Sequence, residues 1–194
     1  RHCLRTQDGA GLIEFIEQRH RERFFEPIQT LGVSRGNVQG YGFAMMALCS
    51  LLVETIQSYR DGLPTTNPGE LGRLRDLNGV PAPYQIPPTL RVNGAAAFRR
   101  FFRHFRDDFE GISGTKFYKN VRNGLLHQGQ TKRGWKIGTG KPNLHAGKTI
   151  DRNTFASRLD QAFVSYLNEL RSRAWETPVW RNARRKIWWL IRLS

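Results

Sequence analysis

Arg122 and His127 lie five positions apart in the stretch "FYKNVRNGLLHQGQT", which runs from Phe117 to Thr131. Together they offer a cation that can hold a phosphate group and a base that can move a proton. Such a pair suits cleavage of a phosphodiester beside its own 2′-hydroxyl, a reaction that these groups can support without a metal ion. A polar residue, Asn123, directly follows the arginine.

The spacing alone does not bring the two side chains together. On an ideal helix Arg122 and His127 point about 140° apart, whereas Asn123 and His127 share a face. Two glycines favour convergence. Gly124 places no side chain between the pair, and Gly129 predicts that the helix ends just beyond the histidine, because glycine readily takes the left-handed conformation that ends helices.

A structural role is the alternative interpretation of the pair. Arg122 would then satisfy a charge in the core or at the surface, and His127 would be an ordinary helix-end residue. A second arginine and histidine with the same spacing, Arg99 and His104, show that spacing is not diagnostic. That second pair lies within a helical pattern of phenylalanines and arginines, whereas the first lies at a helix end that glycine terminates.

Hydrophobic spacing predicts the elements that must position the pair. Apolar residues recur at helical spacing in five segments, which predicts an all-α fold, an up-and-down bundle of four to five helices. The segments are 12–31, 38–59, 95–109, 117–128 and 154–174. Pro27 should disturb the end of the first helix, and Asp151 or Asn153 should cap the last. Between the last two segments, "WKI" and "KTI" are expected to pair as a small β-hairpin.

Two regions depart from the bundle pattern: one lies within a predicted helical domain of residues 1–174, and the other follows that domain. Residues 62–93 hold six of the nine prolines and predict an irregular Pro-rich insertion, either a lid or a plain insertion, with a short helical turn at 71–77. Residues 175–194 form a basic and aromatic tail. Docking as a final helix is the favoured interpretation, with a platform for single-stranded RNA and an anionic membrane surface as alternatives.

The charge of the chain is concentrated in its second half. The net charge is +15; residues 1–90 hold nine Lys and Arg against nine Asp and Glu, and residues 91–194 hold 22 against seven. This distribution predicts a polyanionic partner, such as RNA, an acidic membrane or an acidic protein. The expected RNA contacts flank the Arg/His pair: Lys116, Lys119, Lys132 and Arg133. A solvated helix face is the favoured interpretation for four residues of the motif helix: Lys116, Lys119, Asn120 and Gln128.

Several classes of site and location lack a signal in the sequence. The apolar run "FAMMALCSLLV" (43–53) is too short to cross a bilayer, and the first residues do not resemble a signal peptide, so a cytoplasmic protein without a membrane span is expected. The two cysteines and the remaining histidines lack metal-ligand spacing. "GTGKP" lacks the Ser or Thr of a phosphate-binding loop. Neither a metal nor a nucleotide cofactor is therefore predicted.

The motif "RNGLLH" resembles the arginine, polar residue, spacer and histidine signature of the HEPN superfamily, the small helical bundles of bacterial and archaeal defence and toxin systems. The order of the helices is similar too, and "LCSLLVETIQSYRDG" resembles the second helix of that bundle, with Glu54 at a polar position inside it. The resemblance covers roughly residues 12–174.

This resemblance implies a metal-independent endoribonuclease that works as a homodimer, with two motif helices facing each other across a composite cleft. By match to the motif, His127 would be the acid and base, Arg122 the phosphate clamp and Asn123 a helper, with Glu54 orienting Arg122. Other members of such bundles bind nucleic acids or proteins without cutting, so a regulatory module remains the alternative. An antitoxin or sensor protein is a further partner that fits.

Overall fold

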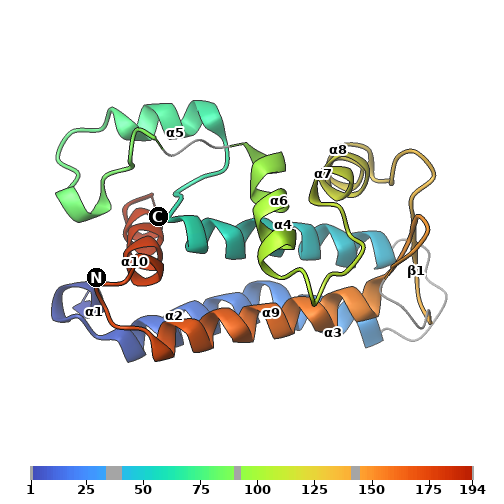
Figure 1. Cartoon of the computed structure of the whole chain (residues 1–194), viewed down its shortest axis with the longest axis horizontal. Helices are drawn as coiled ribbons and strands as arrows, with labels where there is room; N and C mark the ends of the chain where they lie inside the picture. Colours follow the sequence, from blue (N-terminus) through green and yellow to red (C-terminus); the bar gives the residue numbers. More distant parts are fainter. Residues whose placement is uncertain (1, 34–40, 90–92, 141–144, 194) are drawn as a thin grey trace.

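The computed structural model describes residues 2–33, 41–89, 93–140 and 145–193. Helices surround a central helix, α4 (Tyr41–Asp61), and the only sheet among the described residues is small, so the predicted all-α bundle is confirmed. Figure 1 shows the first helical segment (residues 9–33) and α9 (Arg152–Ser172) running side by side beneath α4. The helices that pack on α4 are α3 (Glu26–Val33), α6 (Gly94–His104), α8 (Asn123–Gln128), α9 (Arg152–Ser172) and α10 (Pro178–Leu193).

The predicted first helix is one continuous helical segment with a wide turn inside it. It follows the short α1 (His2–Thr6) and consists of α2 (Gly9–His20), the π-helical turn η1 (Arg21–Phe25) and α3. The Glu26 N–H donates to the carbonyl of Arg21, five residues earlier. Pro27 lacks an N–H and its ring crowds the preceding turn, so the wide turn lets the helix continue past the proline.

Helix α4 begins at the edge of the described residues, so the predicted start at residue 38 lies outside them. Among the described residues it is the one helix long and apolar enough to cross a membrane by length and composition, and 56% of its most apolar window is buried inside the protein. Met46, Leu52 and Val53 are fully buried in the main core. Its place at the centre of the bundle accounts for its apolar character. Two residues of the predicted apolar pattern are instead exposed, Phe43 at 37% and Leu51 at 36%.

A cluster of phenylalanines joins α6 to its neighbours. The five phenylalanines of the predicted 95–109 helix are all buried: Phe98, Phe101, Phe102, Phe105 and Phe109. The helix itself ends earlier, at His104, and Phe109 reaches the core from the turn that follows. Phe117 stacks on Phe155 of α9 with ring centroids 5.2 Å apart, which ties the motif region to the long helix behind it.

The small sheet has a different pairing from the predicted one. β1 (Lys136–Gly138) pairs in parallel with β3 (Thr149–Asp151), so the hairpin expected between "WKI" and "KTI" is wrong. The strand antiparallel to β3 is β2 (His145–Ala146), which reaches β3 through Gly147 in the left-handed region at φ 61°. After β3, Asp151 caps α9 by accepting from the Thr154 N–H at 2.9 Å, as one of the two predicted caps.

The Pro-rich segment and the tail form a second core together. The segment carries α5 (Pro68–Arg75) and the 3₁₀ turn η2 (Ala82–Tyr84), so it is less irregular than predicted, although α5 overlaps the expected turn at 71–77. Four of its residues pack around Trp189 of α10: Leu63, Leu71, Leu74 and Ile86. Other α10 residues, Trp180, Ala183 and Ile187, belong to the main core, so the tail docks as a final helix.

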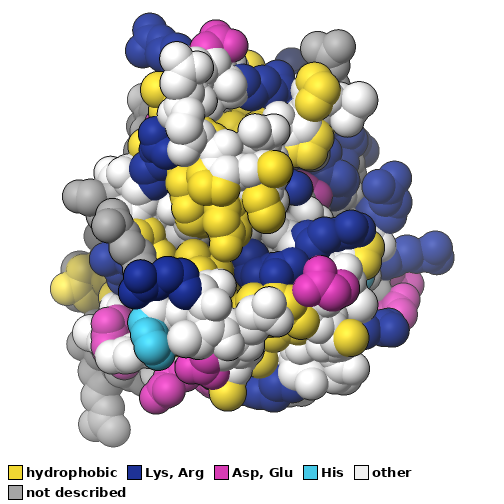
Figure 2. Space-filling view, turned by 90° about the vertical axis from the view of Figure 1, so that its left-hand side faces the viewer, with side chains coloured by type: hydrophobic (Ala, Val, Ile, Leu, Met, Phe, Trp, Pro, Cys, Tyr) yellow, Lys and Arg dark blue, Asp and Glu magenta, His cyan; other side chains and the backbone are white. Residues whose placement is uncertain are grey.

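The end of the molecule where α1, the Pro-rich segment and α10 meet has a mixed surface. Figure 2 shows hydrophobic side chains beside Lys and Arg side chains on this face. A pocket of about 660 Å³ lies between these three elements, with Tyr84 and Trp188 among its lining residues. The two rings stack with their centroids 5.3 Å apart, and the Arg192 guanidinium lies 5.1 Å from the centre of the Trp188 ring. One of the aromatic side chains of the tail, Trp188, therefore makes its contacts within the chain.

Candidate functional site

The motif lies on a helical stretch that contains a second π-helical turn. α7 (Gly114–Phe117), η3 (Tyr118–Arg122) and α8 follow one another without a break, and Gly129 ends the stretch in the left-handed conformation at φ 65°. The Gly129 end matches the prediction, whereas the π turn was not predicted. The Asn123 N–H donates to the carbonyl of Tyr118, so the backbone widens directly before the motif. Single π turns of this kind are frequent at functional sites.

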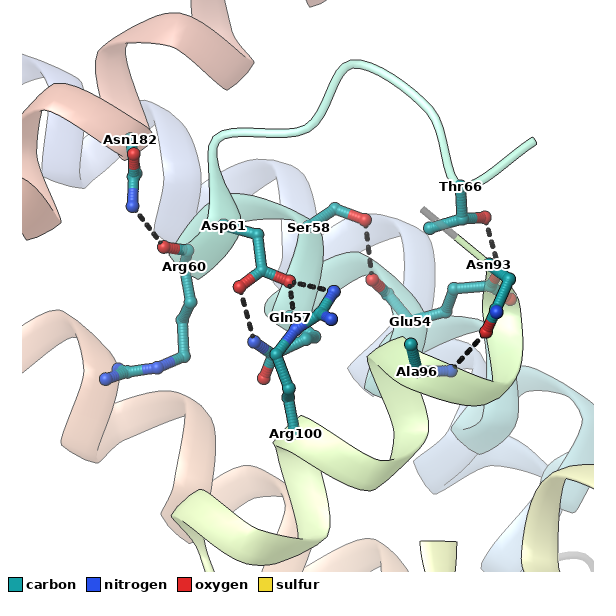
Figure 3. Close-up of polar contacts among 10 residues, drawn as sticks. All are labelled: Glu54, Gln57, Ser58, Arg60, Asp61, Thr66, Asn93, Ala96, Arg100 and Asn182. Carbon is teal, nitrogen blue, oxygen red and sulfur yellow. Dashed lines mark hydrogen bonds and ion pairs between the residues drawn. The ribbon is translucent and has the colours of Figure 1, made fainter. Parts of the chain in front are cut away.

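Arg122 forms an ion pair with Glu54 of α4. Its Nη2 donates to Glu54 Oε2 at 3.0 Å, and the two side chains are only 17% and 11% exposed. The other carboxylate oxygen of Glu54 accepts from the hydroxyl of Thr66, which Figure 3 shows above the helix. A carboxylate that accepts on both oxygens has one fixed orientation, so Glu54 holds the guanidinium from a rigid central helix.

The remaining contacts of Arg122 come from its own helix. Nη1 donates to Asn123 Oδ1 at 3.2 Å, and the guanidinium carbon lies 5.5 Å from the centre of the Tyr118 ring. The Nε atom is buried and has no hydrogen-bond partner among the described residues. Arg122 is thus oriented by a carboxylate, an amide and an aromatic face, which is the arrangement of a preorganised cation rather than of a freely solvated one.

His127 lies apart from this group within one chain. Its side chain is exposed at the end of α8, and among the described residues no hydrogen bond joins it to Arg122 or Asn123. The structure therefore brings Glu54, Arg122 and Asn123 together but leaves the histidine separate. The guanidinium is turned toward α4 by Glu54, whereas the histidine, five positions later on the helix, remains at the surface.

Gly124 has a role that the sequence pattern did not suggest. A Cβ atom there would lie 2.3 Å from the carbonyl oxygen of Gln130, because the chain doubles back against the motif helix after Gly129. The returning segment is held by backbone bonds, with Lys132 N–H donating to the carbonyl of Asn120 at 2.8 Å. The glycine thus allows the close approach that fixes the loop beside the histidine.

Replacing Gly124 by alanine is expected to destabilise the protein by about 1–3 kcal/mol, since the added methyl group overlaps backbone that cannot move cheaply. The matched control is Gly72→Ala in α5, where an added Cβ meets nothing within 4 Å. That change should stabilise the helix by about 0.5–1 kcal/mol, because alanine is the better helix former. Urea denaturation of both variants measures the difference, and equal midpoints would contradict the close-approach argument.

The predicted RNA contacts do not form one group. Lys116, Lys119 and Arg133 are exposed and Lys132 is half-buried. Lys116 and Arg133 line a common pocket of about 510 Å³, whereas Lys119 and Lys132 are not part of its lining. Asn120, expected on a solvated face, is instead buried at 8% exposure and lines the same pocket.

Several residues near the site were missed by the sequence analysis. Lys148 lines the pocket of Lys116 and Arg133, but it lies in the β2–β3 turn, and only the fold brings it there. Thr66 of the Pro-rich segment donates to Glu54, and Lys186 of α10 holds the same segment. The Lys186 Nζ donates to the carbonyl of Pro64 at 2.8 Å, and burial lowers its pKa to about 8. A lysine directly before the apolar residues of the tail was the one sequence signal that could have pointed to this contact.

Further polar contacts fix α4 to α6 and α10 beside the site (Figure 3). Arg100 of α6 donates to Asp61 Oδ2 from both Nε, at 3.0 Å, and Nη2, at 2.7 Å. Asn182 of α10 donates to the carbonyl of Arg60 at 2.6 Å. These contacts anchor the C-terminal end of α4, so Glu54, two turns earlier, is presented by a helix that is held along its length.

The described residues contain no group of three or more His, Cys, Asp or Glu side chains placed to hold a metal ion. Charge at the site is provided instead by the Glu54 and Arg122 pair and by the lysines and arginines around the motif helix. Comparison with models of protein families, with curated proteins and with solved structures gives no match to this chain.

Proposed function

We propose that the chain is a metal-independent endoribonuclease of the HEPN type, acting in a defence or toxin system. The observation that carries the proposal is the preorganised Arg122, held by Glu54 at 3.0 Å on the same helix as an exposed His127. A fixed cation and an exposed imidazole are the two groups that cleavage beside a 2′-hydroxyl requires.

In the proposed reaction His127 removes the proton of the 2′-hydroxyl, and the resulting oxygen attacks the adjacent phosphorus. Arg122 stabilises the negative charge that develops on the phosphoryl oxygens, and Asn123 positions the phosphate. The bond from phosphorus to the 5′-oxygen breaks, and the protonated His127 gives its proton to that oxygen. The products are a 2′,3′-cyclic phosphate and a 5′-hydroxyl end, so no water molecule and no cofactor enters this step.

A homodimer is part of the proposal, because the imidazole and the guanidinium are separate within one chain. An isologous pairing of two motif helices would bring the exposed His127 of each chain toward the Arg122 of the other. The proposal places such a dimer in the cytoplasm, with RNA as substrate and an antitoxin or sensor protein as a further partner.

The experiment is cleavage of labelled RNA by the purified protein in excess EDTA. We expect products with a cyclic phosphate end, undiminished by the chelator, and no cleavage at a site where the substrate carries a single 2′-deoxy substitution. Light scattering of the same preparation should give the mass of a dimer. Loss of cleavage on chelation, or cutting at the deoxy position, would contradict the proposed chemistry.

A non-catalytic module that binds nucleic acid or a protein is the second candidate. The observation that favours it is the ion pair of the guanidinium with Glu54 together with its hydrogen bond to Asn123, contacts that also describe an arginine that only satisfies a buried carboxylate. The two candidates differ in one measurement: the module binds RNA without changing its length, at any protein concentration and in any buffer.

A further inference from the structure

Two basic pockets meet on one side of the motif helix. The pocket that contains Lys116 and Arg133 has a volume of about 510 Å³ and includes Ser113 in its lining. A neighbouring pocket of about 580 Å³, between α6 and the start of α7, also includes Ser113. The two therefore adjoin at Ser113, and together we name them the basic groove.

Cationic side chains line the basic groove at both of its ends. Arg99, Arg100 and Arg103 line the α6 end, and Lys116, Arg133 and Lys148 line the other. Neither set of described lining residues includes an aspartate or a glutamate. Asp61 neutralises Arg100 at 2.7 Å, so the other five cations provide the field.

The backbone of Arg133 is in a strained conformation. Its φ of 53° lies in the left-handed region, where a residue with a side chain is strained and glycine is favoured. Lys148 is directed to the same spot, since its Nζ donates to the carbonyl of Arg133 at 3.0 Å. Two long cationic side chains therefore lie at one loop, and Arg133 has a backbone conformation that glycine adopts more easily.

We propose that the basic groove binds the phosphate backbone of a single-stranded RNA and leads it to the Arg122 and His127 pair. The inference rests on the proposed ribonuclease function for the identity of the polymer. A series of cations of which, among the described residues, only Arg100 is in an ion pair with a carboxylate suits a chain of phosphates, since each contact releases counterions. Because the cations lie on both sides of Ser113, the strand crosses the 111–114 segment.

The groove and the motif share one helix. Lys116 and Asn120 line the groove, and His127 lies 11 residues beyond Lys116. At 1.5 Å per residue this separation is about 16 Å along the helix axis, which corresponds to a few nucleotides of backbone. The groove therefore holds the substrate to one side of the bond that is cut.

The test is fluorescence anisotropy of a labelled single-stranded RNA with the full chain carrying His127→Ala, so that binding is read without cleavage. Removing Arg99 and Arg103 together (Arg99→Ala, Arg103→Ala) should weaken binding on the order of tenfold, since charge-assisted contacts are lost. The log–log salt slope should become shallower by about 1.4. The matched control is the double change Arg23→Ala and Arg181→Ala, two exposed arginines outside the groove, which should leave the affinity within about twofold.

Arg133→Gly separates binding from structure. It removes a cation and relieves the left-handed strain, so we expect weaker RNA binding together with an unchanged or higher melting temperature. Equal losses of RNA affinity in the control pair and in the groove pair would show that the basic groove is not the binding site. So would Arg133→Gly with full affinity, or groove changes that weaken binding only to anionic vesicles. Binding is measured in a chain that cannot cleave. If the protein binds RNA through the basic groove but the unaltered chain never cuts it, only the proposed ribonuclease function is wrong.

Discussion

Replacing His127 by alanine is expected to lower the rate of RNA cleavage by about 10²–10⁴-fold, the usual contribution of a general acid or base. The exposed imidazole makes no hydrogen bond to the described residues, so its removal should leave the fold and the proposed dimer intact. The measurement is the single-turnover cleavage rate, with the melting temperature and the mass in solution recorded for the same sample.

His104→Ala is the matched control for that change. His104 is also exposed and also follows an arginine by five positions, but its Nδ1 lies 3.4 Å from Arg60 Nη2, and it does not line the basic groove. The control should cut RNA at the unaltered rate. If His104→Ala and His127→Ala reduce the rate equally, or if neither does, the assignment of His127 as the acid and base is wrong.

The second large effect is expected from Trp189→Ala, which should destabilise the protein by about 3–5 kcal/mol, because a fully buried indole leaves a cavity. Trp189 has no exposed surface, packs among the leucines of the Pro-rich segment, and donates from Nε1 to the carbonyl of Tyr84 at 3.0 Å. Denaturant unfolding measures the loss.

The neighbouring Trp188 provides the control. It is only half-buried and stacks on Tyr84, so Trp188→Ala should cost about 1 kcal/mol. Loosening the Pro-rich segment should also release Thr66 from Glu54, so Trp189→Ala is expected to reduce cleavage more than binding. Equal stability of the two tryptophan variants would show that α10 does not hold the segment.

The local pattern of the sequence was sufficient to predict the main helices of the bundle. Their apolar periodicity predicts the bundle, since a helix with one apolar stripe must bury that stripe, and Gly129 and Asp151 predict the ends of two helices through single-residue backbone chemistry. The π turns before Pro27 and Asn123 were not predicted. A wide turn depends on how the helix is packed on both sides, and the spacing of side chains carries little trace of it.

The pairing of the small sheet was decided by the fold. "WKI" and "KTI" have the composition of two strands, but composition does not distinguish parallel from antiparallel neighbours. The strand between them, β2, takes the antiparallel place beside β3 and leaves β1 the parallel one. Strand direction depends on where the connecting chain can pass, which short segments cannot specify.

For the candidate site, the sequence by itself determined which groups are present: an arginine, an asparagine and a histidine on one helix that ends in glycine, and a glutamate on an earlier helix. The tertiary structure decided their partners. It turned Arg122 toward Glu54 and left His127 exposed, because an ion pair between helices depends on their packing and not on spacing within one of them. It also brought Thr66, Lys148 and Lys186 near the site, since contacts between residues far apart in the chain form only when the core that joins their elements has formed.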